Sequence, residues 1–220
     1  MHPSKEFSMF VPPFYRPPDS SWMTEIIRDN PLGLLASNGP AGGVPFATHL
    51  PAVLQSFDTG SADPSGSVLL CHLNRQNPHW SALESGDTVL LTFTGPHGYV
   101  TPAVYAYTPA APTWNFTSVH VRGTVEKLDS AEETLEVITA TVRAFESRFG
   151  SGWDMTGSIG YFQKILPGVG AFRVRVTGAD GMFKLSQEQS GEVQDRVRRS
   201  FDGHASPHCR AVAGLMDRLP

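Results

Sequence analysis

This chain of 220 residues contains few cysteines and carries a small net charge. The two cysteines, Cys71 and Cys209, lie far apart in the sequence, which excludes a disulfide framework and a zinc site built from cysteine pairs. Charged residues make up 17% of the chain and the formal net charge is −4, so the sequence offers no general attraction to a nucleic-acid backbone. We therefore expect two reduced thiols and no nucleic-acid partner.

Long apolar runs are missing as well. The longest, Ser67–Cys71 and Thr88–Phe93, are far shorter than the roughly 20 residues that span a bilayer. Residues 1–18 place Lys5 and Arg16 among prolines and contain no apolar segment of the kind found in signal peptides. These features predict a cytoplasmic protein that does not cross a membrane.

The common catalytic motifs do not occur in the sequence either. It has no Gly-x-Ser-x-Gly elbow, no Walker phosphate-binding loop and no Gly-x-Gly-x-x-Gly fingerprint. Serine hydrolysis, P-loop phosphoryl transfer and Rossmann-type dinucleotide binding therefore lose their usual support. The sequence also has no His-x-x-x-His pattern accompanied by a carboxylate, the arrangement that would bind a zinc ion directly. The chemistry is expected to come from a bound planar cofactor.

Glycine and proline are abundant, with 21 and 18 residues, and they fall between short apolar runs, which indicates a β-rich fold. A turn is expected at Ala179-Asp180-Gly181. The number of candidate strands favours a closed barrel over an open sheet. There are seven of them: Leu32–Ser37, Phe46–Leu54, Ser67–Leu73, Thr88–Thr94, Gly98–Val104, Phe116–Leu128 and Gly170–Thr177.

Helical patterns flank these strands. Ser130–Phe149 has apolar residues on one face and opens with Ser130 and Glu133 as a capping box. We predict a mainly β fold with flanking helices (α+β) in a single domain, with an extended N-terminal arm at 1–18 and a helical C-terminal appendage at 188–220. The other predicted helices are Asp19–Asn30, Asn77–Leu83 and one or two in the appendage, broken near Asp202-Gly203.

Residue types that carry chemistry concentrate in Ala47–Pro51, Cys71–Trp80 and Gly95–Asn115. A single histidine is more often a satisfied structural residue than a ligand or catalyst, but a cluster of imidazoles favours a ligand or an acid-base role. Phe183–Gln187 offers a cation, a hydroxyl and an amide to a phosphate or carboxylate, and an ordinary solvated strand end fits it equally well. Five of the eight histidines lie at strand ends: His49, His72, His79, His97 and His120.

At these stretches the sequence resembles the PaiB-like family, described as FMN-binding negative transcriptional regulators. The matching elements occur in family order and cover nearly the whole chain. They are Met9–Pro12, Asn30–Gly33, Ala47–Pro51, His72–Trp80, Gly95–Val100, Pro112–Asn115, Val119–Gly123 and Phe183–Gln187. The resemblance implies a split β-barrel of the flavin-reductase and pyridoxamine-phosphate-oxidase type, which forms a homodimer with its cofactor sites at the subunit interface.

Three sequence segments are most similar to one branch of this family, the heme b-dependent piperazate synthases. They are Thr92–His97, Thr108–Phe116 and Gly150–Asp154. That similarity implies an enzyme that forms the N–N bond of L-piperazic acid from N5-hydroxy-L-ornithine with loss of water. The N–O bond of the substrate is already at the oxidation level of the N–N bond in the product, so the reaction needs no external oxidant. The expected partner is therefore a small amino-acid substrate.

The resemblance also implies roles for particular residues. His72 is the expected axial ligand of the heme iron, with His79 as the second choice. His49, Thr48 and Tyr105 are candidates for holding the substrate carboxylate and removing protons. The remaining cofactor-binding candidates are Arg75, Arg122 and Lys184 for the propionates, Tyr99, Trp114 and Phe116 for an apolar wall, and Ser186 and Gln187 beside Lys184.

Two alternatives share this fold. In an FMN-binding regulator or flavin-dependent reductase, Lys184, Ser186 and Arg75 would hold the phosphate, and Trp114 would stack on or beside the flavin. A regulator that binds DNA would also need a basic surface, and the arginines of residues 196–199 are better interpreted as the exposed face of an amphipathic helix. A heme-degrading or heme-storing barrel is the third possibility.

Overall fold

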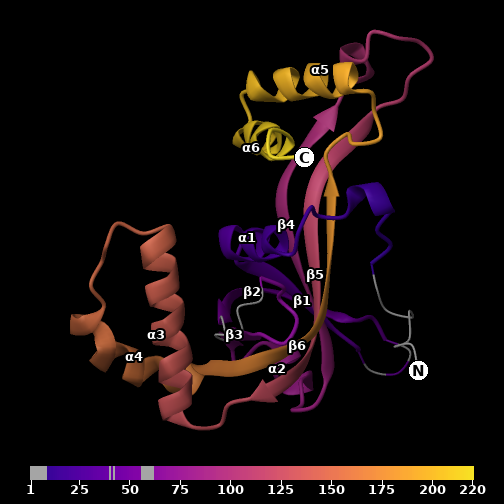
Figure 1. Cartoon of the computed structure of the whole chain (residues 1–220). Coiled ribbons are helices and arrows are strands. Elements are labelled where there is room, and N and C mark those ends of the chain that lie inside the picture. Colours follow the sequence, from indigo (N-terminus) through magenta and orange to yellow (C-terminus); the bar gives the residue numbers. More distant parts are fainter. Residues whose placement is uncertain (1–8, 40, 42, 56–61) are drawn as a thin grey trace. The chain divides into compact units, whose positions relative to one another are not determined.

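The computed structural model describes residues 9–39, 41, 43–55 and 62–220, and Figure 1 shows its elements. Residues 1–8 of the predicted N-terminal arm lie outside this description. The chain divides into two compact units. The first unit comprises residues 9–29, 94–120 and 180–220, and the second comprises the described residues of 30–93 and 121–179. The single-domain organisation stays a prediction.

Six strands form a closed barrel in the order β1-β2-β3-β6-β5-β4. The predicted β-barrel with flanking helices is therefore confirmed. In the second unit β1 pairs with β2 and β4, and β3 pairs with β2 and β6, all antiparallel. The strands are β1 (Leu32–Ser37), β2 (Phe46–Gln55), β3 (Val68–Asn74), β4 (Thr88–Val100), β5 (Thr113–Lys127) and β6 (Val169–Lys184).

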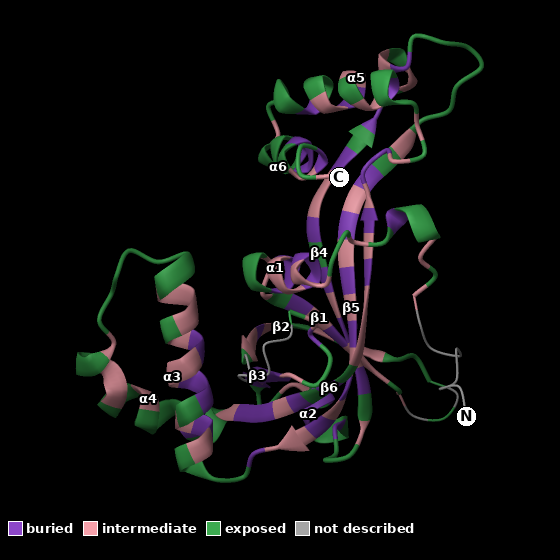
Figure 2. Cartoon of the chain, viewed as in Figure 1, coloured by how far each residue is buried: buried purple, intermediate pink, exposed green. Residues whose placement is uncertain are grey.

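Strand β3 shows how side-chain alternation builds both surfaces of the barrel wall. Leu69 and Cys71 are fully buried, while Val68 and Leu70 point to the opposite face and pack with Val137 of helix α3. Figure 2 shows α3 (Ala131–Arg148) with one buried and one exposed side, as its sequence pattern predicted. Ser130 caps this helix by accepting a hydrogen bond from the Glu133 amide at 3.1 Å.

Two sequence predictions about strands are wrong. Thr88–Thr94 and the first residues of Gly98–Val104 belong to one strand, β4, which ends at Val100, whereas Pro102–Val104 form a short 3-10 helix. The expected turn at residues 179–181 lies inside β6. Gly95 and Gly181 are needed for close packing rather than for turning. A Cβ at Gly95 would lie 2.8 Å from Cδ1 of Ile26, and one at Gly181 would lie 2.8 Å from Cγ of Met23. Both neighbours belong to helix α1 (Ser21–Asp29).

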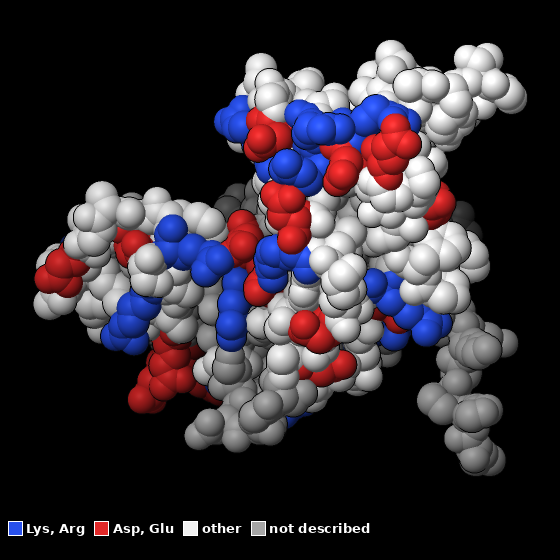
Figure 3. Space-filling model, turned by 45° about the horizontal axis from the view of Figure 1, so that its top comes forward, with Lys and Arg blue, Asp and Glu red and all other residues white. Residues whose placement is uncertain are grey.

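The first unit contains α1 and the C-terminal helices α5 (Gly191–Asp202) and α6 (Pro207–Met216), which confirms the predicted break between them. Basic and acidic side chains are mixed over these helices at the top of Figure 3. Arg196 pairs with Glu192 and Arg198 pairs with Asp217. Such paired charges form an amphipathic helix surface rather than a continuous basic stripe.

Two short helices complete the second unit, α2 (Pro78–Ala82) and α4 (Ile159–Ile165). Asn77 caps α2 by accepting a hydrogen bond from the His79 amide at 2.9 Å. Cys71 and Cys209 are both buried and form no disulfide. None of the helices within the described residues has the length and apolar character needed to span a membrane.

Candidate functional site

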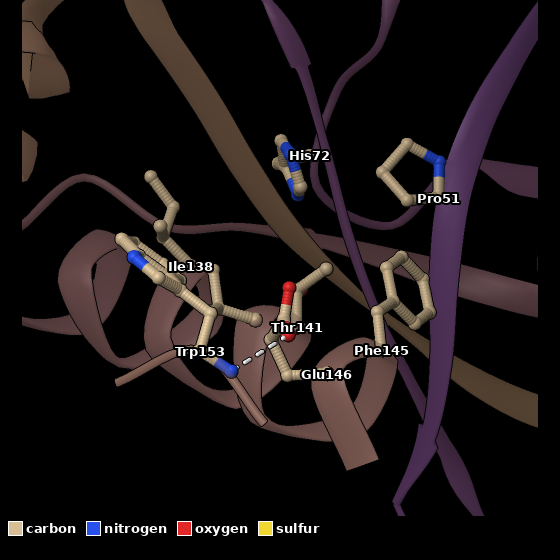
Figure 4. A pocket seen from close by; sticks show the side chains of 8 residues that line it. Pro51, His72, Ile138, Thr141, Phe145, Glu146 and Trp153 are labelled. Atoms are coloured by element: carbon tan, nitrogen blue, oxygen red, sulfur yellow. Dashed lines mark hydrogen bonds between the residues drawn. The ribbon is translucent and has the colours of Figure 1, made fainter. Parts of the chain in front are cut away.

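A pocket of about 350 Å³ lies in the second unit, between the barrel wall and helix α3. His72 of β3 and Pro51 of β2 form one side, and α3 forms the other (Figure 4). His72 reaches it because it follows Val68 and Leu70 on the outward face of β3, opposite Ala171 of β6. The remaining lining residues are Ile138, Thr141, Val142, Phe145, Glu146 and Trp153.

The imidazole of His72 is the unusual group of this pocket. Its Nδ1 atom is buried and has no hydrogen-bond partner among the described residues. Burial lowers the pKa of His72 below its ordinary value, so the ring is held neutral near pH 7. A neutral imidazole with an uncommitted nitrogen is the form in which histidine binds a metal ion. Sequence analysis predicted this residue as the iron ligand, and its position is compatible with that role.

The pocket also contains a carboxylate that sequence analysis did not select. Glu146 of α3 accepts a hydrogen bond from the backbone N–H of Trp153 at 3.2 Å (Figure 4). Gly150 packs tightly against it, since a Cβ there would lie 2.5 Å from the Glu146 Cδ atom. The helical pattern predicted that the face of α3 carrying Phe145 packs against the barrel. It gave no sign that the loop leading to Trp153 would pack against the following residue, Glu146.

His79 has the opposite environment. Its side chain is almost completely buried, with Nδ1 lying 2.9 Å from the hydroxyl of Thr48 and Nε2 lying 2.9 Å from the hydroxyl of Ser37. The ring stacks on Phe46, and Asn77 donates a hydrogen bond to Thr48 at 3.3 Å. Both ring nitrogens are therefore engaged within the protein. This arrangement favours His72 over His79 as the residue that could bind a metal.

The other candidates of the second unit do not line the pocket. His49 is exposed on β2. Arg75 donates from Nε to the carbonyl of Val169 at 2.8 Å, and its guanidinium lies 5.3 Å from the ring centroid of Trp80. A side-chain nitrogen of Arg122 lies 2.9 Å from the point that a Cβ on Gly178 would occupy. The structure thus brings only His72 of these predicted residues into the pocket among the residues it describes.

In the first unit the predicted residues near the end of β6 form a compact group. The ammonium of Lys184 donates to the hydroxyl of Thr113 and lies 5.8 Å from the ring centroid of Tyr15. Burial, together with the nearby carboxylate of Glu188, raises the pKa of Tyr15 to about 12. Lys184 therefore lies beside the neutral phenol of Tyr15 and beside Thr113, which precedes Trp114 in the sequence.

Ser186 and Gln187 hold the chain that follows Lys184. Ser186 is buried in the left-handed region at φ 68°, and its hydroxyl lies 2.9 Å from the side-chain nitrogen of Asn115. Gln187 accepts from the amide of Leu185 and donates to the carbonyl of Phe183, both at 2.6 Å. These bonds make the segment a locked turn, which fixes the direction of Lys184.

The predicted aromatic wall also belongs to the first unit. Trp114 and Tyr99 are each about half exposed, and their ring centroids lie 6.0 Å apart. Phe116 lies two positions further along the same face of β5 as Trp114. Tyr105 is buried, stacks on Tyr107 and accepts a hydrogen bond at its carbonyl from Arg196. The shared pocket expected for Trp114 and Lys184 stays a prediction.

Sequence comparisons place these features among related proteins. A family model described as "Putative FMN-binding domain" matches residues 9–178. The protease synthase and sporulation protein PAI 2 of Bacillus subtilis is 25% identical over 211 residues, covering 95% of this chain and 97% of that protein. Protein AN0679 of Emericella nidulans, described as uncharacterized, is 28% identical over 229 residues, covering 89% and 91%.

Solved structures with a similar fold include two proteins whose descriptions name a cofactor. The FAD and heme binding protein from Mycobacterium smegmatis has a TM-score of 0.56 and 15% identity, over 77% of this chain and 73% of that one. The flavocytochrome Anf3 from Azotobacter vinelandii has a TM-score of 0.55 and 18% identity, over 82% and 74%. At these identities the similarity establishes a common split-barrel fold.

Proposed function

The chain belongs to the PaiB-like family of FMN-binding-domain proteins, and from this membership we propose that it binds heme b in the pocket between β3 and α3, with His72 as the axial ligand of the iron. The observation that carries the proposal is the imidazole of His72 in the lining of this pocket, with its Nδ1 atom free of any hydrogen-bond partner among the described residues. A buried polar atom left in this way costs about 1–3 kcal/mol. Iron ligation would use an imidazole that the protein itself does not satisfy.

The walls of the pocket supply apolar surface of the kind that a porphyrin contacts. Pro51, Ile138, Val142, Phe145 and Trp153 present apolar surface around His72. A porphyrin is a flat apolar ligand that needs such contacts on its faces, while its iron needs an axial donor. The two split-barrel proteins described as a FAD and heme binding protein and as a flavocytochrome support the capacity of this fold to hold heme.

The finer part of the proposal is that the chain is a piperazate synthase, as its sequence resemblance implies. In N5-hydroxy-L-ornithine the α-amine attacks N5, the N–O bond breaks, and a proton passes from the amine to the departing hydroxyl, which leaves as water. A bound heme would supply a Lewis-acidic iron for the hydroxylamine. The protein's part is to hold the imidazole of His72 neutral and to keep bulk water away from the reacting nitrogens with the apolar walls.

A flavin is the second candidate, and a specific group of residues favours it. Lys184 is held beside Thr113 of β5, and a locked turn follows it. An ammonium next to a hydroxyl suits the phosphate of FMN, and we propose that the half-exposed ring of Trp114 would stack on or beside the flavin. Under this alternative the His72 pocket would not be the cofactor site.

The absorption spectrum of the purified protein, before and after addition of hemin, distinguishes the two cofactors. We expect a Soret band that saturates at one heme per chain, and conversion of N5-hydroxy-L-ornithine to piperazic acid by the loaded protein. A flavin spectrum together with no hemin uptake would reject the heme proposal. Hemin uptake without formation of piperazic acid would reject the synthase activity and leave heme binding standing.

A further inference from the structure

We propose that His97 and His208 form a binding site for one divalent transition-metal ion of the group Cu²⁺, Ni²⁺ and Zn²⁺. His97 lies on β4 and His208 lies at the start of α6, and the centroids of their rings are 4.5 Å apart. Both residues belong to the first unit, and neither lines the His72 pocket. The proposal therefore does not depend on the proposed function.

The backbone determines which nitrogen of His97 is available to a ligand. Nδ1 lies 3.2 Å from the carbonyl oxygen of Gly95, and a carbonyl can only accept a hydrogen bond. Nδ1 therefore carries the proton in the neutral ring, and Nε2 carries the lone pair. Histidines that bind metal ions commonly have this arrangement, in which a backbone carbonyl fixes the tautomer and orients the ring. His97 thus offers Nε2 as a metal ligand.

Close packing holds α6 against β4 beside this histidine. Gly98 follows His97, and a Cβ at Gly98 would lie 3.0 Å from Sγ of Cys209 and 3.0 Å from Cζ of Phe201. Cys209 and Phe201 are both buried, so the contact belongs to the tightly packed core of the first unit. Because Cys209 directly follows His208, this contact positions the backbone of His208 next to His97, and Figure 1 shows α6 beside β4.

The separation of the two rings suits a shared ion. Bonds from such ions to imidazole nitrogen are about 2.0–2.1 Å long, so an ion bound to both residues would lie about 3.2 Å from each ring centroid. Two ligands at about 90° to each other then have ring centroids about 4.5 Å apart, and ligands at the tetrahedral angle have centroids about 5.2 Å apart. The observed 4.5 Å agrees with the first of these values. His208 is exposed, so its ring can turn toward an ion that enters from solvent.

The two donors select the class of ion. Imidazole nitrogen suits Cu²⁺, Ni²⁺ and Zn²⁺, whereas Mg²⁺ and Ca²⁺ prefer oxygen ligands. Within the described residues no group of three or more His, Cys, Asp or Glu side chains is placed to hold a metal ion, so this site has two protein ligands and water would complete the coordination. The ring centroid of Trp114 lies 6.0 Å from that of His97, which makes its fluorescence a local reporter of the ion.

The test is a titration of CuCl₂ into the metal-free, full-length protein, followed by tryptophan fluorescence, because Cu²⁺ is bound most tightly in this series of ions. We expect His97→Ala and His208→Ala each to weaken binding at least about tenfold, since the loss of even an outer partner of a metal ligand has an effect of this size. The double variant should lose less than the two single losses combined, because both residues hold the same ion. His49→Gln, which removes an exposed imidazole elsewhere, is the control and should bind like the wild type.

Electron paramagnetic resonance of the bound Cu²⁺ gives a second readout. We expect coupling to two imidazole nitrogens in the wild type and to one in each single variant. His208 is exposed, so His208→Ala is expected to fold, which its urea midpoint checks. His72→Leu should keep this Cu²⁺ site whether or not it loses heme, so the outcome is separate from that of the heme proposal.

Two rings that merely pack against each other give a different result. In that case the wild type, His208→Ala and His49→Gln would respond alike to Cu²⁺, and this outcome would overturn the proposal. Fully additive losses in the double variant would overturn it as well, because they would assign the two histidines to separate ions.

Discussion

His72 and His79 belong to the same short segment of the second unit, and their environments are opposite. Burial lowers the pKa of both imidazoles. His79 has Thr48 and Ser37 on its two ring nitrogens, whereas His72 has a buried nitrogen with no partner among the described residues and lines a pocket. The difference shows that hydrogen-bond partners, rather than burial or residue type, separate a structural histidine from a candidate ligand.

The largest effect on stability is expected at His79. In His79→Leu the hydroxyls of Ser37 and Thr48 lose their partner, so the free energy of unfolding should fall by about 2–4 kcal/mol. Urea unfolding of the heme-free protein measures this change. His72→Leu is the matched variant and should lose far less. Equal losses in the two variants would remove the distinction between the two histidines.

Thr48→Val tests the same hydrogen-bond group from its other member. The substitution removes the acceptor of the Asn77 side chain and the partner of His79 Nδ1. We expect a loss of about 1–2 kcal/mol in urea unfolding. Thr139→Val, which alters an exposed hydroxyl on α3, should change stability by less than about 0.5 kcal/mol. A larger loss at Thr139 would mean that the Thr48 effect is not specific.

Acidification tests the protonation state of both rings in the heme-free protein. The pKa of each ring in the folded protein lies below its ordinary value of 6.5, so the unfolded chain takes up these protons first as the pH falls. Stability should therefore decrease below pH 6.5, by at most about 1.4 kcal/mol per pH unit for each ring. Urea unfolding midpoints measured from about pH 7 to about pH 5 give the slope of stability against pH. This range is chosen because it includes the ordinary histidine pKa of about 6.5. A slope that is unchanged in His72→Leu would contradict the neutral state assigned to His72.

The smallest change is expected in the stability of heme-free His72→Leu at neutral pH. Leucine removes a buried nitrogen that lacks a partner and places an apolar side chain against Ile138 and Val142. The free energy of unfolding should stay the same or rise by up to about 1 kcal/mol. Thermal unfolding of the variant and the wild type measures it. A loss above about 2 kcal/mol would show that His72 has a structural partner after all.

Much of the fold could be predicted from local sequence patterns. Short apolar runs between glycines and prolines identified most of the strands, and Ser130 with its apolar helical face identified α3, because these patterns follow from strand and helix geometry. Gly95 and Gly181 were misread because glycine permits turns and close packing alike, and the contacts with α1 that decide between them come from distant parts of the chain. Predicting whether a strand ends at such a glycine requires knowledge of the tertiary structure.

The site was less predictable than the fold. His72 could be selected from its place after a buried strand and from family resemblance, but its unpartnered nitrogen is visible only in three dimensions. Glu146 gave no local signal, since it looks like any polar residue near the end of a surface helix, and only the structure shows the loop at Gly150 and Trp153 packed against it. A pocket assembled from β2, β3 and α3 depends on side-chain directions that sequence spacing does not determine.

Titration of hemin into the wild type, His72→Leu and His79→Leu, followed at the Soret band, tests most directly that His72 is the heme ligand. The account predicts saturable binding by the wild type, at least about 100-fold weaker binding by folded His72→Leu because the iron–imidazole bond is lost, and retained binding by the folded fraction of His79→Leu. Wild-type affinity in His72→Leu together with loss of binding in folded His79→Leu would contradict it.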